Sequence, residues 1–320
     1  MKTFPMTPNG DNSPSHLPLL SLTNRKCRLV IHGTQEWYDL YTSERINELN
    51  AFFDRYTKDV PNNWESTPHI RATVLPFNKG PVTNIPLKSP VWPPIDQTTQ
   101  KRLFFVPGGR LAETKPSEEG EVTYQADAAP ILQRGNDPGE IQFEFPFVEK
   151  TTILGPSRAV LHVRAEQGND MDVYVHLRKA DTEGNLLEHV NIPLADLGVR
   201  SADEVPLTNP MKHYGPHGIL RASYRDVDVD LSKPHWKTLS HKKRLPVPVG
   251  ETIRLEIEIW PTGMAFEAGE RLVVRLAGHF MGPAEFEALQ GAFPVCNKGA
   301  HMLSCGGEPA SYIDIPVVEL

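Results

Sequence analysis

The stretch RKCRLVIHGTQEWYDLYTSERINELNAFFDRYTK, residues 25–58, decides how the first part of this chain folds. Residues 29–31 are a short continuous apolar run, which is typical of a strand buried on both faces. His32 ends this strand and opens a loop. Ser43 is the expected cap of a following helix, with Glu44 beside its positive N-terminus. The stretch therefore predicts a buried strand, a loop that carries a histidine, and a helix.

The predicted helix has one apolar face. Its apolar side chains recur at spacings of three and four residues: Ile46, Leu49, Phe52, Phe53 and Tyr56. The helix must end before Pro61, because proline breaks a helix interior. A large exposed apolar face is a liability. We expect this one to fold onto the rest of the chain and cover it, or to self-associate or bind a partner through Leu49, Phe52, Phe53 and Tyr56.

After Trp64 the hydrophobic pattern changes to a period of two, which indicates strands. In residues 254–259 the leucine and isoleucines face one way and the charges face the other. Short strands separated by turn signals, in a chain with 30 Pro and 23 Gly, favour a β-sandwich or jelly roll. The strand candidates are 69–75, 102–106, 141–147, 159–164, 172–178, 219–225, 252–260, 271–276 and 311–317, and the turn candidates include 181–185, 248–250 and 261–263.

Composition excludes several classes of protein. A net charge of −7 argues against nucleic acid or an anionic membrane as the main partner. No apolar run is long enough to span a bilayer. Three cysteines do not suggest a disulfide framework, and residues 1–24 resemble a disordered tail rather than a signal peptide. We therefore expect a cytoplasmic protein.

Several segments in a fixed order resemble one family. They begin with Phe52-Phe53-Asp54-Arg55-Tyr56-Thr57-Lys58 and Asn62-Asn63-Trp64-Glu65. The later segments are 155–156, 170–175, 218–225, 250–251, 259–263, 268–272 and 306–307. Together they span residues 25–320 and resemble the C-terminal part of the X-Pro dipeptidyl-peptidase and cocaine esterase family of serine hydrolases.

The resemblance implies a mainly β fold. It implies a galactose-binding-like jelly-roll β-sandwich, preceded by a short β-loop-α remnant of an α/β-hydrolase domain. On this basis residues 1–24 are a disordered tail, 25–60 are the remnant, and 61–320 are the jelly-roll domain. The family's nucleophile and triad aspartate would precede residue 25, where the sequence holds no segment for them. We therefore expect a non-catalytic domain, inactive alone and without a cofactor, that depends on a hydrolase domain in cis or in trans.

The candidate catalytic residue is His32, as a remnant of the general base. Family members often place this base a few residues later, near Gln35 and Glu36. An imidazole needs a nucleophile to activate and an acid to orient it. The nearest match to a Gly-x-Ser-x-Gly nucleophile elbow is Gly155-Pro156-Ser157-Arg158-Ala159. Because a strand rather than a helix follows, we interpret it as a β-turn.

Other polar clusters favour structural roles, and no metal site is expected. Asp226, Asp228 and Asp230 alternate, but the sequence after them departs from the EF-hand pattern. The histidines at 213, 217, 235 and 241 lack metal-ligand spacing. A ligand-binding module stays open as an alternative, since the fold hosts carbohydrate binding elsewhere and five tryptophans could stack on sugars: Trp37, Trp64, Trp92, Trp236 and Trp260.

Overall fold

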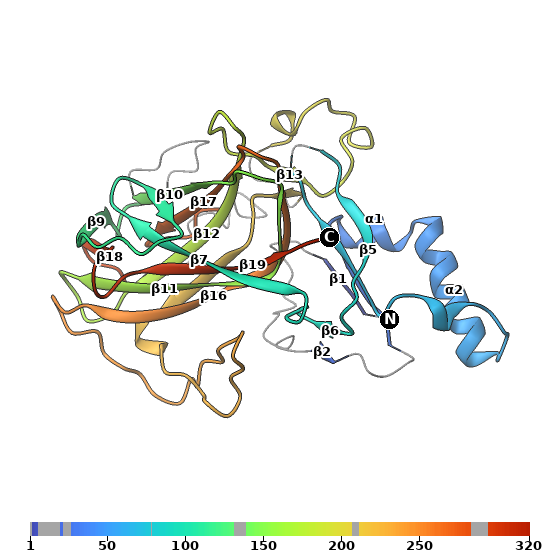
Figure 1. Ribbon diagram of the computed structural model, residues 1–320, viewed down its shortest axis with the longest axis horizontal. Helices are drawn as coiled ribbons and strands as arrows, with labels where there is room; N and C mark the ends of the chain where they lie inside the picture. The colour runs from blue at the N-terminus through green and yellow to red at the C-terminus, as the bar shows by residue number, and fades with distance from the viewer. Residues whose placement is uncertain are drawn as a thin grey trace.

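A computed structural model describes residues 2–5, 20–21, 27–77, 79–130, 139–206, 211–282 and 294–320. The chain forms a large β-sandwich with a small mixed sheet and two helices beside one end of it (Figure 1). The fold is mainly β and is a jelly-roll sandwich, as the strand pattern predicts.

The sandwich is built from long strands that wrap around one core. One layer has the order β15-β12-β17-β10 and the other contains β7, β19, β11 and β16. The first layer consists of β10 (Glu140–Pro146), β12 (Asp172–Ala180), β15 (His217–Arg221) and β17 (Arg271–Ala277). The second consists of β7 (Thr98–Val106), β11 (Thr151–Ala165), β16 (Ile253–Phe266) and β19 (Tyr312–Val318), extended by β8 (Arg110–Ala112), β9 (Gly120–Gln125) and β18 (Ala300–Cys305).

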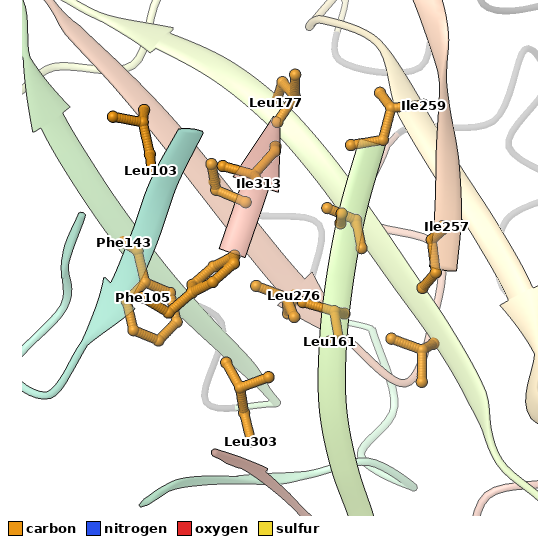
Figure 2. Packing of buried hydrophobic residues seen from close by; sticks show 14 of the residues in the cluster. Leu103, Phe105, Phe143, Leu161, Leu177, Ile257, Ile259, Leu276, Leu303 and Ile313 are labelled. Atoms are coloured by element: carbon orange, nitrogen blue, oxygen red, sulfur yellow. The ribbon is translucent and has the colours of Figure 1, made fainter. Parts of the chain in front are cut away.

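The core lies between these two layers, and Figure 2 shows its side chains meeting from both. Phe105 of β7 and Phe143 of β10 are in edge-to-face contact, with ring centroids 4.8 Å apart. The alternation predicted for residues 254–259 is confirmed, because Leu255, Ile257 and Ile259 are buried and the glutamates between them are only partly buried.

The small sheet has the order β1-β3-β4-β5. Its strands are β1 (Lys2–Pro5), β3 (Leu29–His32), β4 (Ile70–Val74) and β5 (Val82–Pro86). Helices α1 (Glu36–Leu40) and α2 (Ser43–Thr57) and the 3-10 turn η2 (Trp64–Ser66) connect β3 to its parallel neighbour β4. All four residues of β3 are buried, as predicted for this strand. The predicted histidine loop and helix follow it.

Helix α2 does not cover the sandwich, contrary to expectation. It projects away from the sandwich on the far side of the small sheet (Figure 1). Ile46 and Phe53 are 43% and 50% exposed, because only the Phe52 side of the helix packs, onto the buried Trp64. The helix cap is also not Ser43 but Thr42, whose hydroxyl accepts a hydrogen bond from the Arg45 amide at 3.3 Å.

Two predicted turns are wrong, because both lie inside long strands. The glycine-proline-serine stretch from Gly155 falls in β11, and residues 261–263 fall in β16. The two segments pair with each other across a β-bulge between Gly155 and Ser157. A bulge bends a strand without ending it. Proline and glycine therefore mark a bend here rather than a turn.

The small sheet and the sandwich share a seam. The Leu75 amide donates to the Gly263 carbonyl at 2.9 Å, and the Ala265 amide donates to the Leu75 carbonyl at 3.1 Å. A Cβ atom on Gly263 would lie 2.3 Å from the Thr73 carbonyl oxygen, so only glycine allows this approach. Leu154 and Val318 of the sandwich also join the core of the small sheet.

The predicted domain boundary at residue 60 stays a prediction. The small sheet contains strands from both sides of this boundary, because β3 pairs with β4. Within the predicted tail, Lys2–Pro5 pairs with β3, and β2 (Leu20–Ser21) pairs with β6 (Val91–Trp92). The rest of residues 1–24 lies outside the described residues. Among the helices of the described ranges, none combines the length and apolar character needed to cross a bilayer.

Candidate functional site

The candidate histidine lies at the end of β3 and is buried, with 3% of its surface exposed. His32 Nδ1 is 3.5 Å from Thr34 Oγ1 and 3.9 Å from Asp39 Oδ2. A carboxylate beside Nδ1 is the group that orients a catalytic imidazole and fixes its tautomer. The loop thus holds a histidine–aspartate pair, with Asp39 supplied by helix α1.

The electrostatics of this pair favour a neutral imidazole. Burial lowers the pKa of His32, and the Arg45 guanidinium lowers it further, while Asp39 opposes both. Asp39 is shared, because its Oδ2 also accepts a hydrogen bond from Arg45 Nε at 3.0 Å. Part of the charge that would stabilise a protonated His32 is therefore already neutralised.

Gln35, near which the family resemblance places the base, has a structural role here. Its side-chain oxygen caps α1 by accepting hydrogen bonds from the Trp37 amide at 2.9 Å and the Tyr38 amide at 3.0 Å. An amide side chain has no basic nitrogen. Glu36 is exposed on the first turn of the same helix.

The loop that follows His32 is also held by hydrogen bonds from the sandwich. Residues 181–206 and 211–216, which lie between β12 and β15, are called the excursion here. They contain β13 (His189–Val190), η3 (Ala202–Glu204) and β14 (Lys212–His213). His189 Nε2 lies 3.0 Å from the Gly33 carbonyl oxygen. The Gln35 amide donates to the Asn191 carbonyl at 2.9 Å, and the Tyr38 hydroxyl donates to the Asp196 carboxylate. Burial lowers the pKa of His189, so the neutral ring donates its Nε2 proton to Gly33.

Sequence reasoning missed these excursion residues. They carry no motif, and they lie more than 150 residues from the loop that they contact. The one available signal is composition: His189 and Asn191 are polar residues in a segment between two strands that pack together.

Ser157 is not a nucleophile in this arrangement. It is 1% exposed within β11, and its hydroxyl has no hydrogen-bond partner in the described part of the chain. A nucleophile elbow needs an exposed serine on a strand-to-helix turn. Where the structure is described, His32 therefore has a carboxylate 3.9 Å from its Nδ1 and no hydrogen bond to a serine.

The other polar clusters resolve into structural contacts. Asp226 and Asp228 form ion pairs with Lys243 and Lys242 at 3.0 and 2.7 Å, which account for their charge without calcium. Within the described ranges, no group of three or more His, Cys, Asp or Glu side chains has the geometry to hold a metal ion.

The candidate histidines and tryptophans are dispersed. His213 is buried and His217 is half-buried on the excursion side of the sandwich, and His241 is exposed in a loop. Trp64 and Trp92 are buried whereas Trp37 is 63% exposed, so the tryptophans do not form one stacking surface.

Comparison with known proteins places these features in context. The family model for the X-Pro dipeptidyl-peptidase C-terminal non-catalytic domain matches residues 62–314. A CocE/NonD family hydrolase from Staphylococcus aureus superposes with a TM-score of 0.75 at 24% identity, over 92% of this chain and 49% of that one. A search of the curated proteins finds no significant match.

More distant solved structures have the same fold. An aminopeptidase from a marine sediment Thaumarchaeota archaeon has a TM-score of 0.60 at 15% identity, over 92% of this chain and 50% of that one. An α-amino acid ester hydrolase has a TM-score of 0.58 at 17% identity, over 91% of this chain and 50% of that one. The chain thus spans about half the length of the solved structures that it matches.

Proposed function

Because the chain belongs to the X-Pro dipeptidyl-peptidase C-terminal non-catalytic domain family, we propose that it is the non-catalytic β part of a serine hydrolase for X-Pro peptides or esters. In this proposal an α/β-hydrolase domain, in the same polypeptide or in a separate chain, supplies the nucleophile. The names of the solved relatives, which are a hydrolase, an aminopeptidase and an ester hydrolase, support this class of reaction. The three free cysteines support a reducing, cytoplasmic location.

One observation carries the proposal: the sandwich fixes the histidine loop. The hydrogen bonds from His189 to Gly33 and from Gln35 to Asn191 tie the loop to the excursion. A catalytic imidazole must be positioned to within a fraction of an ångström to act on its nucleophile. We infer that the β domain contributes this positioning, with His32 as the remnant of the base.

The proposed docking face for the hydrolase domain is the α1/α2 apolar surface, which we define as Trp37, Tyr41, Ile46 and Phe53. These side chains are 63%, 72%, 43% and 50% exposed. They come from two consecutive helices and the C-cap of the first, and large exposed apolar side chains that lie near one another are typical of an interaction site. The solved relatives are about twice as long as this chain, which favours a hydrolase domain over a second copy of the chain as the occupant.

Activity measurements test the chemical half of the proposal. The purified 320-residue chain should not release p-nitroaniline from an X-Pro p-nitroanilide or p-nitrophenol from an ester faster than buffer does. A fluorophosphonate probe should label no serine. Turnover that the phosphonate abolishes would show a complete serine site within this chain and would overturn the proposal.

A reconstitution experiment tests the docking half. The hydrolase fragment of the Staphylococcus aureus relative is mixed with this chain, and binding is followed by titration calorimetry. Replacing Trp37 and Phe53 with serine should abolish binding, whereas Val148→Ser, at a 91% exposed position, should not change it. Concentration-dependent dimerisation that the Trp37→Ser, Phe53→Ser variant abolishes would favour self-association instead.

A further inference from the structure

One outer face of the sandwich carries a row of basic side chains that are buried or half-buried. His217, His176 and Arg275 lie directly opposite one another on β15, β12 and β17. Arg178 follows His176 by two residues and so shares its face of the sheet. Every residue of β12 is buried, although only alternate residues can point into the core.

The excursion covers this face. His176 Nε2 is 3.1 Å from the Gly215 carbonyl oxygen, and the guanidinium of Arg178 lies over the Tyr214 ring at 4.8 Å. A Cβ atom on Gly215 would lie 1.9 Å from the Leu177 carbonyl oxygen, so the excursion backbone touches the sheet directly. The basic row is thus sealed between a sheet and a loop segment, not inside the hydrophobic core.

Four buried polar side chains in and beside this layer are incompletely hydrogen-bonded. The atoms without a hydrogen-bond partner among the described residues are Arg178 Nε, His176 Nδ1, both ring nitrogens of His213, and both amide atoms of Asn191. These residues are 5%, 3%, 4% and 1% exposed, respectively. Native proteins satisfy the great majority of such groups. Asn191 and His213 also share one face of the β13/β14 hairpin, since His189 pairs with His213 and Asn191 follows by two.

Arg178 differs from its basic neighbours because it has no carboxylate partner close by in the described residues. Arg275 forms an ion pair with Glu140, and Lys212 forms one with Glu188 at 2.8 Å. Across the described part of the chain, Arg178 has no carboxylate within 4.0 Å, and its one hydrogen bond is a long one of 3.4 Å to the Leu187 carbonyl. Burial and the nearby Arg275 lower the pKa of Arg178 to about 10, while the more distant Glu188 and Glu140 oppose them, so it stays a cation at neutral pH. An unpaired buried charge is strongly unfavourable.

We propose that Arg178, His213 and Asn191 form an internal site for a small oxyanion of the carboxylate or phosphate type. The guanidinium offers a planar fork of donors that matches such an anion. Asn191 adds an amide donor, and the neutral His213 ring adds one N–H group. Water would satisfy these hydrogen bonds but would bring no negative charge to Arg178, whose carboxylate neighbours in the described residues all lie beyond 4.0 Å.

Such an anion would stabilise the histidine loop indirectly. It would bind the excursion to the sheet at Arg178, and the same excursion holds the loop through His189 and Asn191. The inference does not depend on the proposed hydrolase function, because it rests only on charge and hydrogen bonding within this chain.

Thermal unfolding of the full chain at constant ionic strength tests the site. Sodium phosphate or sodium acetate replaces sodium chloride stepwise. We expect a saturable rise in Tm with at least one oxyanion. Arg178→Met should abolish the rise or raise the half-saturating concentration about tenfold or more, as loss of a charge-assisted hydrogen bond implies. Arg254→Met, at an exposed arginine of β16, is the matched control and should keep the rise.

A second readout separates an anion site from a purely structural arginine. Without oxyanion, Arg178→Met should be at least as stable as the wild-type chain, because the variant removes an unpaired buried charge. The proposal fails if the wild-type Tm does not rise, if Arg178→Met shows the same rise, or if the variant is equally destabilised with and without oxyanion. If Arg178→Met does not fold, titration calorimetry measures phosphate binding to the wild type and to Arg178→Lys. Binding that is tenfold or more weaker in Arg178→Lys supports the site. No binding to the wild type, or equal binding to both proteins, overturns it.

Discussion

Mild acid should destabilise this protein strongly, because buried histidines that are neutral in the folded chain take up protons when it unfolds. Burial lowers the pKa of His213 from 6.5 to about 3, and the pKa values of His217 and His301 from 6.5 to about 4. Below pH 6.5 the unfolded chain binds protons at these rings and the folded chain does not. Stability must therefore fall as the pH falls from 6.5 towards 4.

The size of the effect follows from these values. Between pH 7.5 and 5.0 each of the three histidines lowers the free energy of unfolding by about 2 kcal/mol. Glu258 acts in the opposite direction, because burial raises the pKa of its carboxyl from 4.5 to about 7. As the pH falls, that carboxyl takes up its proton in the folded chain before it does so in the unfolded chain. It therefore raises the free energy of unfolding by about 2 kcal/mol over the same interval. For these four groups together the net loss is about 4 kcal/mol, a large part of the stability of a typical domain.

Urea unfolding at several pH values between 7.5 and 5.0 measures this loss. His213→Phe should remove about 2 kcal/mol of the pH dependence, and Glu258→Gln should steepen the dependence by a similar amount. His241→Asn, at an exposed loop histidine, should leave the dependence unchanged. A free energy of unfolding that is flat from pH 7.5 to 5.0, or a His213→Phe variant with the full wild-type dependence, would refute the reasoning.

Two further predictions concern the seam and the histidine loop. Gly263→Ala should cost more than about 2 kcal/mol and lower Tm, because its new methyl group would collide with the backbone carbonyl of Thr73; an unchanged Tm would contradict this close approach. His189→Ala should cost about 2 kcal/mol, since it leaves the Gly33 carbonyl unpaired and removes a buried ring. Amide hydrogen exchange at Gln35 should accelerate in the His189 variant but not in His241→Asn; equal protection in both would show that the excursion does not hold the loop.

The sequence predicts best those elements whose burial follows from their own pattern. The apolar run at residues 29–31 is a buried strand, and the alternation at 254–259 is a strand with one buried face. Residues 261–263 mislead because their proline and glycine serve a bend in β16, and that bend depends on the approach of β4. Likewise, the polar positions of β12 suggest a solvent-facing side, but a distant segment of the chain covers them.

In the histidine loop, too, some features can be predicted from the local sequence and others depend on distant residues. The place of His32 after a buried strand can be predicted locally, and its partner Asp39 is only seven residues away. The residues of the excursion that hold the loop are about 160 positions distant and belong to the sandwich. The orientation of the loop is therefore a property of the β domain, and it does not require a nucleophile to be in place. His32 and Asp39 themselves precede residues 62–314, which match the non-catalytic domain family, whereas the excursion residues that hold the loop lie within that match.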